Sequence, residues 1–302
     1  MSRKRIVLIG EAMLELSRPQ SGSGREDWRM GYGGDTLNTA IHLARAGHDV
    51  AYLTALGSDP LSAELKAKWA GEGLDISLVL EHPSRGTGLY AIDTDSAGER
   101  SFTYWRDTSA AREMLALPGS DDALASAAQA NLVGFSLITL AILPQPARDA
   151  LLAMARRVRA RGGQVAFDGN YRPRLWGSVD EARTARDAAI ACATIGLPTL
   201  EDETALSGEA DGAAVASHWQ GLGCAETVVK LGPAGCLLPG DAILEPKAVL
   251  SPVDTSGAGD AFNAGYLGAR LNGADPGVAA RAGHALAGWT IMRPGAIPAA
   301  EP

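Results

Sequence analysis

Cysteine is scarce in this chain, whose 302 residues include three of them. Cys192, Cys224 and Cys236 show no CxxC spacing, which excludes the common zinc clusters and suits a reducing compartment. The five histidines form no HxxxH pair, so the sequence predicts no metal site built on imidazole. We expect a cytoplasmic protein.

Long apolar runs and an excess of basic residues are also lacking. No stretch approaches the roughly 20 apolar residues that cross a bilayer. The start, MSRKRIVLIGEAM, is charged like a signal peptide, but its apolar run is short and ends at Glu11. Lys and Arg total 27 against 35 for Asp and Glu, a net charge of -8, which argues against binding a phosphate backbone. We therefore expect neither a membrane nor a nucleic acid as a partner.

The composition that is present, 46% hydrophobic and 21% charged, is that of a globular protein. A chain of this length suits one large α/β domain with a small appendage, or two modest domains. Residues 6–10 (IVLIG) are typical of a strand buried on both faces of a parallel sheet. A helical pattern follows, with Asp35 placed to cap its start and Gly47 to end it.

Strand and helix patterns then alternate along the chain. Alternation of this kind is typical of right-handed βαβ units in a doubly wound sheet. We expect further strands at 50–55, 132–135, 164–167 and 227–231, and helices at 145–161 and 179–191.

Two segments, about 11–34 and 86–106, break this rhythm. They contain short polar and aromatic strands, expected at 12–16, 89–93 and 101–105, with a loop at the Ser/Gly cluster 21–24. Asp95, Ser96 and Gly98 supply a hairpin turn. We expect a small β-sheet lid on the α/β body. Pairing of two lids would cover exposed edges and aromatic rings, which favours a homo-oligomer.

The stretch DTSGAGD, from Asp254 to Asp260, directly precedes the helical pattern AFNAGYLGARL. Small residues let successive backbone N–H groups converge on an anion, and the following helix adds its positive end. Asp260 lies at the start of that helix, where a carboxylate can accept the proton of an attacking hydroxyl. The alternative is a helix cap beside a tight turn, which is the commoner role of such a loop taken alone.

The chain as a whole resembles the ribokinase-like carbohydrate kinases of the PfkB family. DTSGAGDAF is similar to the C-terminal signature of that family, and other features follow in the family's order. These are Gly10 and Glu11 after the first strand, the pair Gly33 and Gly34 with Asn38, and KLGPAG at 230–235.

The resemblance implies a fold and a set of roles. The fold is a ribokinase-like three-layer α/β/α sandwich with a mostly parallel central sheet and a small β-sheet lid, as a single kinase domain over 1–302. By this similarity Asp260 is the catalytic base, and the anion hole consists of Gly257, Ala258 and Gly259. The residues expected to bind ATP also include Asn170, Lys230, Gly232 and Gly235. For Lys230 without the family, a solvated lysine at a strand end is an equal alternative.

Four stretches, YGGDTLNTAIHLAR, FTYWRD, FDGNYRPRLW and LPTLEDE, resemble 2-keto-3-deoxygluconate kinases more than fructokinases or ribokinases. A 2-keto-3-deoxy acid carries a carboxylate, with which an arginine fork pairs through two parallel hydrogen bonds. The structural alternatives are a solvated lid residue for Arg106, an ion pair for Arg172 and a helix cap for Asp35. The substrate-binding residues that we expect are Gly34, Asp35, Asn38, Tyr90, Tyr104, Arg106 and Arg172.

One departure from the family concerns the metal. Many members carry Asn-x-x-Glu after a strand, associated with Mg²⁺, whereas this chain has Thr199 and Asp202 at those positions. A shorter carboxylate can reach Mg²⁺ through water, because Mg²⁺ usually keeps several waters. We expect Mg²⁺ and assign it no protein ligand. Some relatives also hold a monovalent cation beside the anion hole, and Asp254 is the candidate here.

The expected reaction is transfer of the γ-phosphoryl group of ATP to the terminal hydroxyl of 2-keto-3-deoxygluconate, giving 2-keto-3-deoxy-6-phosphogluconate. A kinase of the same fold for a neutral sugar such as fructose or ribose, or for a nucleoside, is the nearest alternative. A non-catalytic sugar-sensing protein is less favoured, because GAGD is intact. A nicotinamide-dependent dehydrogenase comes last, since the first strand ends in GEAMLE rather than GxGxxG.

Overall fold

The computed structural model describes residues 4–18, 28–94 and 100–299. Its centre is a seven-stranded sheet in the order β11-β10-β9-β8-β1-β4-β5, and the recorded pairs are parallel. The expected α/β fold with a mostly parallel sheet is confirmed. The strands are β1 (Arg5–Ile9), β4 (Asp49–Gly57), β5 (Val79–His82), β8 (Leu132–Ser136), β9 (Gln164–Asp168), β10 (Ile195–Gly196) and β11 (Glu226–Thr227).

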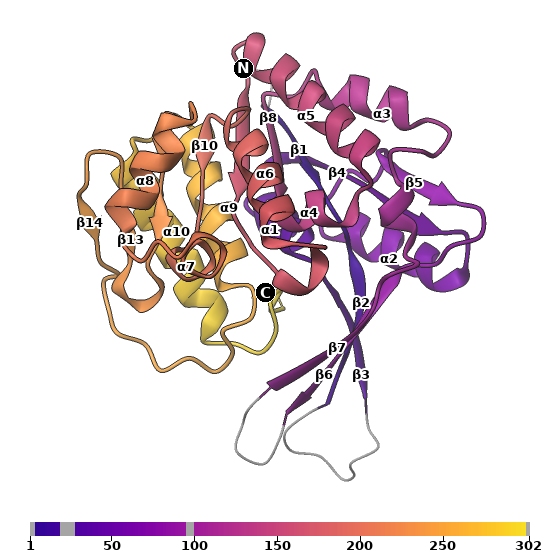
Figure 1. Ribbon diagram of the computed structural model, residues 1–302. Coiled ribbons are helices and arrows are strands. Elements are labelled where there is room, and N and C mark those ends of the chain that lie inside the picture. The colour runs from indigo at the N-terminus through magenta and orange to yellow at the C-terminus, as the bar shows by residue number, and fades with distance from the viewer. Residues whose placement is uncertain (1–3, 19–27, 95–99, 300–302) are drawn as a thin grey trace.

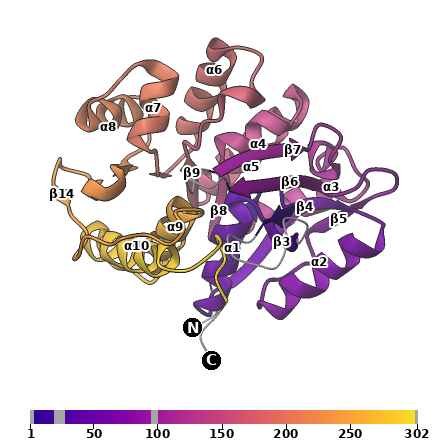
Figure 2. The same ribbon diagram turned by 90° about the horizontal axis from the view of Figure 1, so that it is seen from below.

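Helices cover both faces of this sheet and make three layers (Figure 2). Strand β1 shows why: Ile6 and Leu8 belong to one buried apolar cluster, and Val7 and Ile9 belong to the other. The first cluster contains apolar residues from α1 (Asp35–Arg45), α2 (Pro60–Gly71), α9 (Ala258–Leu271) and α10 (Pro276–Ile291). The second includes α3 (Ser120–Ala127), α4 (Leu137–Ile142), α5 (Gln145–Ala160), α6 (Val179–Ile190), α7 (Leu200–Ser207) and α8 (Gly212–Gly221).

A second sheet of four strands projects from this body at the carboxyl end of β1 (Figure 1). Its order is β3-β2-β6-β7, with β2 (Met13–Ser17), β3 (Arg29–Gly33), β6 (Gly88–Thr94) and β7 (Arg100–Trp105). The three predicted lid strands are confirmed, and β3 is an addition: RMGYG contains two glycines and forms a strand by pairing antiparallel with β2. The predicted turn at Asp95, Ser96 and Gly98 and the loop at 21–24 lie outside the described residues.

The predicted strand at 227–231 is wrong as one element. Its start is β11, at the edge of the central sheet, and its end is β12 (Val229–Lys230), which pairs antiparallel with β13 (Cys236–Leu237). The chain folds back because Gly235 has φ +100, and a Cβ there would lie 2.1 Å from the Leu244 carbonyl oxygen. Strand β14 (Ile243–Leu244) completes this third sheet, and the 3₁₀ turns are Ala110–Glu113, Pro173–Leu175 and Gly232–Ala234.

The start of α1 also corrects an expectation. The N-cap residue is Gly34, with φ 150, and Asp35 is the first helical residue rather than the cap. A side chain at position 34 would place a Cβ 2.3 Å from the Glu11 carbonyl oxygen, so the close approach of α1 to the segment between β1 and β2 requires glycine. Gly47 follows the end of the helix with φ +85, as predicted.

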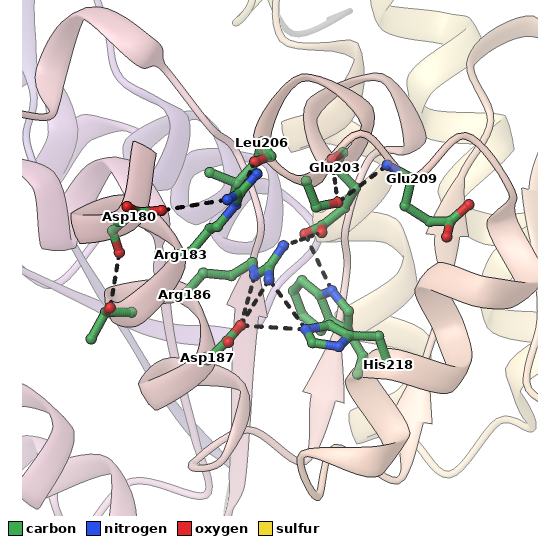
Figure 3. A network of polar contacts seen from close by, with 11 residues as sticks. Asp180, Arg183, Arg186, Asp187, Glu203, Leu206, Glu209 and His218 are labelled. Atoms are coloured by element: carbon green, nitrogen blue, oxygen red, sulfur yellow. Dashed lines mark hydrogen bonds and ion pairs between the residues drawn. The ribbon is translucent and has the colours of Figure 1, made fainter. Parts of the chain in front are cut away.

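A buried polar network joins α6, α7 and α8 (Figure 3). Glu203 accepts hydrogen bonds from Arg186 Nη1 at 2.7 Å and from Trp219 Nε1 at 3.2 Å, so both carboxylate oxygens have donors. Arg186 and Glu203 are 3% and 2% exposed. The network therefore fixes the first turn of α7, in which Asp202 precedes Glu203.

Replacement of Glu203 by leucine is expected to lower the free energy of unfolding by about 3 kcal/mol, because the buried Arg186 would keep only the partly exposed Asp187 as an acidic partner, 2.9 Å from its Nη2. Urea unfolding followed by circular dichroism measures the change. Lys68→Ala, which removes the exposed ion pair with Glu64, is the control and should cost at most about 1 kcal/mol. Equal losses in the two variants would contradict a special role for the buried pair.

Within the described residues, no helix is both long and apolar enough to cross a membrane.

Candidate active site

A cavity of about 1780 Å³ lies between the carboxyl ends of the central strands, the lid sheet and helices α9 and α10. Parallel strands bring their carboxyl ends to one edge of a sheet, where ligands of open α/β folds bind. The cation candidate Asp254 does not line this cavity, whereas the residues expected to bind the substrate or ATP, or to act as the base, all do: Gly34, Asp35, Asn38, Tyr90, Tyr104, Arg106, Asn170, Arg172, Lys230, Gly232, Gly235, Gly257, Ala258, Gly259 and Asp260. Their roles remain predictions, but the fold collects them from distant segments.

Asp260 lies in the first turn of α9 and is 9% exposed. One carboxylate oxygen, Oδ2, accepts a hydrogen bond from Asn38 Nδ2 at 2.7 Å. Burial is the main cause that raises the pKa of Asp260, to about 8; Asp35 and Asp168 raise it further, while Asn38 and Lys230 lower it. A carboxylate with a pKa near 8 can hold or release a proton close to neutral pH, as a general base must.

The glycine turn before Asp260 has the geometry of an anion site. Gly257 is the N-cap of α9, with φ 70 and no side-chain cap. A Cβ on Gly257 would lie 2.6 Å from the Cβ of Ala296, so the turn requires glycine there. The first N–H groups of α9 therefore have no side-chain acceptor at the N-cap and line the cavity with the positive end of the helix.

Lys230, the last residue of β12, is 8% exposed and lies beside this turn. Its Nζ donates to Asp168 Oδ1 at 3.0 Å and to Asn263 Oδ1 at 3.2 Å. The same Nζ is 3.6 Å from the position that a Cβ on Gly259 would take. The alternative of a solvated lysine is wrong, and a fixed ammonium lies close to the anion turn.

Arg106, which follows β7, is 7% exposed, so the alternative of a solvated lid residue is also wrong. Its Nε donates to Glu11 Oε2 at 2.8 Å, and its Nη2 contacts the same oxygen. This pairing uses the side edge of the guanidinium, formed by Nε and Nη2. The end of the fork, formed by Nη1 and Nη2, keeps donors for a ligand in the cavity.

Two buried acceptors in the cavity wall have no protein partner within the described chain, Asn38 Oδ1 and Glu11 Oε1. A buried polar atom without a partner costs free energy unless a ligand or water satisfies it. Asn38 Oδ1 belongs to the amide that contacts Asp260. A hydroxyl group bound beside the carboxylate of Asp260 would supply the missing donor.

The two tyrosines of the lid face the cavity in different ways. Tyr90 is 8% exposed and donates its hydroxyl hydrogen bond to Glu15 Oε2, whereas Tyr104 is 46% exposed. Their ring centroids are 6.0 Å apart. Tyr104 is therefore the tyrosine that a ligand can still cover.

The loop after β9 supplies the remaining polar candidates. Asn170 Nδ2 donates to Asp35 Oδ2 at 3.1 Å, which links this loop to α1. Arg172 Nη1 lies 3.1 Å from Asp202 Oδ1, and the arginine side chain is 51% exposed. Both the ion pair expected as its structural alternative and a place in the cavity wall are therefore observed for Arg172.

The donor set for a metal is small. The described residues contain no group of three or more His, Cys, Asp or Glu side chains arranged to hold a metal ion. Asp202 lines the cavity, and burial raises its pKa to about 6, with Arg172 lowering it. One carboxylate suits Mg²⁺ that enters with substrate phosphates and keeps several waters.

Sequence reasoning missed Asp168 and Asn263 and gave Glu11 no role. Asp168 ends β9 of the central sheet, and it meets Lys230, which ends β12 of the three-stranded sheet, only in the folded molecule. Asn263 follows Asp260 by one helical turn, so the two share a face of α9. Nothing in the sequence indicates that Glu11 pairs with Arg106.

The site combines a buried carboxylate, a glycine turn at the start of a helix and a fixed lysine. These are the parts of a phosphotransferase that acts on a hydroxyl acceptor. Comparison with known proteins agrees with this class. The model of the pfkB family carbohydrate kinases matches residues 3–302. The chain belongs to that family, and its kinase fold is the one that the sequence predicted.

Individual relatives are similar over almost their whole length. The 2-dehydro-3-deoxygluconokinase of Dickeya dadantii (strain 3937) is 45% identical, over 98% of this chain and 97% of the relative. The enzyme of the same name from Escherichia coli (strain K12) is 41% identical, over 97% of each chain. Among solved structures, aminoimidazole riboside kinase from Salmonella enterica, complexed with aminoimidazole riboside and an ATP analog, has a TM-score of 0.80 at 26% identity, covering 97% of this chain and 95% of that one.

Proposed function

We propose that this carbohydrate kinase phosphorylates 2-keto-3-deoxygluconate (2-dehydro-3-deoxygluconate) at its terminal hydroxyl with ATP, giving 2-keto-3-deoxy-6-phosphogluconate. The observation that carries the choice of an acid sugar is Arg106, a buried arginine whose fork end remains open to the cavity. Two relatives above 40% identity carry the name of this activity.

In the proposed mechanism, Asp260 takes the proton of the attacking hydroxyl. The oxygen then attacks the γ-phosphorus of ATP, and the bond from that phosphorus to the β-γ bridging oxygen breaks, which releases ADP. The N–H groups at 257–259 and the Lys230 ammonium balance the charge of the transferred group. Asn38 holds the carboxylate of Asp260 in place through the bond at 2.7 Å.

The two substrates are expected to share the cavity. The structural relative bound to an ATP analog supports ATP as donor, and Asn170, Gly232 and Gly235 are proposed to lie beside the nucleotide. Leu250 and Gly288 line an apolar part of the cavity, and a Cβ at position 288 would lie 3.2 Å from Leu250 Cδ1. This apolar part of the cavity suits the adenine ring. The acid sugar would lie between Gly34, Asp35, Tyr90, Tyr104, Arg106 and Arg172.

Mg²⁺ is proposed to arrive with ATP and to neutralise charge on its phosphates. Asp202 is the residue that would hold it, through water, in place of the glutamate of other family members. The proposed monovalent-cation ligand Asp254 already accepts backbone N–H bonds from Ser256 and Gly295, at 2.8 Å each. The test compares the kinase activity in potassium chloride with that in tetramethylammonium chloride, and higher activity in potassium chloride is expected.

The decisive experiment is a coupled assay of ADP formation with Mg²⁺-ATP that compares 2-keto-3-deoxygluconate, fructose, ribose and adenosine. A preference for the acid sugar of at least about 10²-fold in kcat/KM is expected, because a neutral sugar leaves the fork of Arg106 without an acceptor. Preference for fructose, ribose or adenosine would overturn the proposed substrate and leave the kinase assignment intact. Absence of turnover with all four would revive the sugar-sensing alternative.

The raised pKa of Asp260 makes a prediction about pH. Below about 8 the carboxyl group of the free enzyme is mostly protonated and cannot act as base. The value of kcat/KM is therefore expected to rise up to tenfold per pH unit from pH 6, and to level off above about pH 8. A flat profile between pH 6 and 9, measured with acid sugar well below KM, would contradict Asp260 as base.

The lid is proposed to form an interface between copies of this chain. Phe102 and Trp105 on β7 are 40% and 57% exposed, and Met30 on β3 is 47% exposed. Sedimentation of the protein is expected to show a dimer or a larger assembly, which Trp105→Glu should weaken by placing a charge in the apolar contact. A monomer at micromolar concentration would contradict this interface.

The division of the chain is proposed to be one kinase domain over 1–302. The lid strand β2 continues directly from β1, and β6 and β7 return to the same cavity. Unfolding of the lid and the α/β body together, in one cooperative urea transition, would support this division.

A further inference from the structure

Three side chains form a closed polar ring beneath the glycine turn. Lys230 Nζ donates to Asp168 Oδ1 at 3.0 Å and to Asn263 Oδ1 at 3.2 Å. Asn263 Nδ2 in turn donates to Asp168 Oδ2 at 2.8 Å. Each member therefore contacts the other two, and we call these three residues the lysine ring.

The ring joins three distant segments of the chain. Asp168 ends β9, Lys230 ends β12, and Asn263 lies one turn after Asp260 on α9. Asp168 and Lys230 line the main cavity, whereas Asn263, 4% exposed, does not. Asn263 instead borders a second, small hollow that shares Asp35 and Asp168 with that cavity. It can thus affect a ligand only through the groups that it contacts.

The ring restrains a side chain that is otherwise flexible. A lysine has a long stem with many rotamers, so its ammonium group is mobile unless acceptors hold it. Here two acceptors, one on the sheet edge and one on α9, hold the ammonium 3.6 Å from the Cβ position of Gly259 in the anion turn. The positive charge is therefore in place before any phosphate arrives, which is the condition for electrostatic stabilisation without reorganisation.

We propose that Asn263, together with Asp168, is a positioning residue that holds the Lys230 ammonium under the anion turn, where it meets the transferred phosphoryl group. This inference rests on the proposed phosphoryl transfer from ATP and not on which sugar accepts the group. Asn263 keeps the distance between α9 and the sheet edge, and Asp168 holds the ammonium from the sheet side through the bond at 3.0 Å.

The ring also influences the base. The groups that face Asp260 are Asp35 and Asn38 from α1, Asp168 from β9, Lys230 from β12 and Tyr90 from β6. Of these, Lys230 and Asn38 lower the pKa of Asp260, and the two carboxylates raise it. A lysine that leaves its position would lower that pKa less. Displacement of Lys230 is thus visible in the pH profile as well as in the rate.

The test uses Asn263→Leu, a change that keeps the branched shape and removes the polar atoms, with Asn263→Ala as a second variant. Both are expected to lower kcat by about 10- to 100-fold, as for a reacting group misplaced by about 1 Å. The KM for the sugar should stay within about threefold. The acidic limb of kcat/KM should move to higher pH, in the same direction as in Lys230→Met.

The matched control is Tyr266→Phe, on the same helix, which removes a partly buried hydrogen bond of 2.7 Å to Glu226; neither residue lines the cavity. It should lose thermal stability and keep both kcat and the position of the acidic limb. A purely structural Asn263 would behave in the same way, so a stability loss with an unmoved limb, or an unchanged kcat, overturns the proposal.

The assay is run with whichever sugar the unmodified enzyme phosphorylates. A neutral sugar as substrate would end the acid-sugar proposal and leave this test intact. Conversely, normal kcat in the folded Asn263 variants with 2-keto-3-deoxygluconate would end the positioning role and leave the proposed reaction intact. If Asn263→Leu does not fold, as shown by the absence of a melting transition, Asn263→Ala and Lys230→Met are used instead. The measurement is the same shift of the acidic limb of kcat/KM to higher pH.

Discussion

Replacement of Asp260 by asparagine is expected to lower kcat by at least about 10²-fold, the smallest contribution usual for a general base. Asparagine has nearly the same shape, but its amide cannot accept a proton at neutral pH. The bond from Asn38 can persist, because Asn38 Nδ2 donates to Oδ2 of residue 260 and the amide oxygen can take that place. The enzyme should therefore fold, and ADP formation with saturating sugar measures the loss.

The control for Asp260→Asn is Asp211→Asn. Asp211 is the N-cap of α8, and its side chain accepts the Ala213 backbone N–H; asparagine caps a helix about as well. This variant should keep full activity. If Asp260→Asn also keeps normal turnover while folded, Asp260 is not the base, and the glycine turn alone must account for catalysis. The pH dependence assigned to Asp260 should disappear in the residual activity of the variant.

Removal of the Arg106 charge is expected to lower kcat/KM for the acid sugar by about 30-fold or more, the lower end of 2–5 kcal/mol for a buried charged contact. Arg106→Met alone would leave Glu11 buried without a partner, and breaking a buried pair in this way is strongly destabilising. The informative variant is therefore Glu11→Gln/Arg106→Met, which removes both charges. Its activity on any neutral sugar that the enzyme accepts should change little.

The matched control is Arg45→Met/Glu72→Gln, which removes another arginine–glutamate pair, 2.6 Å apart from Nε to Oε2, outside the cavity lining. This control should keep the KM for the acid sugar. Arg172→Gln should raise that KM less than the Arg106 change, because Arg172 is half exposed and a water can replace it. Equal KM values in the Glu11/Arg106 variant and the unmodified enzyme would contradict carboxylate recognition by Arg106.

The layers of the fold could be predicted from the sequence because they depend on local periodicity. Apolar runs such as 6–10 indicate strands buried on two faces, and the helical spacing after Asp35 indicates a helix. The short elements were less predictable. Strand β3 and the split of 227–231 into β11 and β12 depend on pairing with distant strands, and no local pattern encodes that pairing.

The glycine turn and the carboxylate after it were also predictable, because all the residues that form them are adjacent in the stretch DTSGAGD. The charge state of the site was not. The pKa of Asp260 depends on Asp35 and Asp168, which are distant in the chain and meet it only where the sheet edge and α1 converge. Burial, the largest cause, is a property of the packed molecule alone.

The sequence by itself thus determined the class of fold, the anion turn and the candidate base, because each rests on neighbouring residues. The tertiary structure decided which charges pair: Arg106 with Glu11, and Lys230 with Asp168 and Asn263. Coulomb and hydrogen-bond contacts act over a few ångströms in space, whatever the separation along the chain. The partners of a buried arginine or lysine therefore become known only when the strands and helices that carry them are packed together.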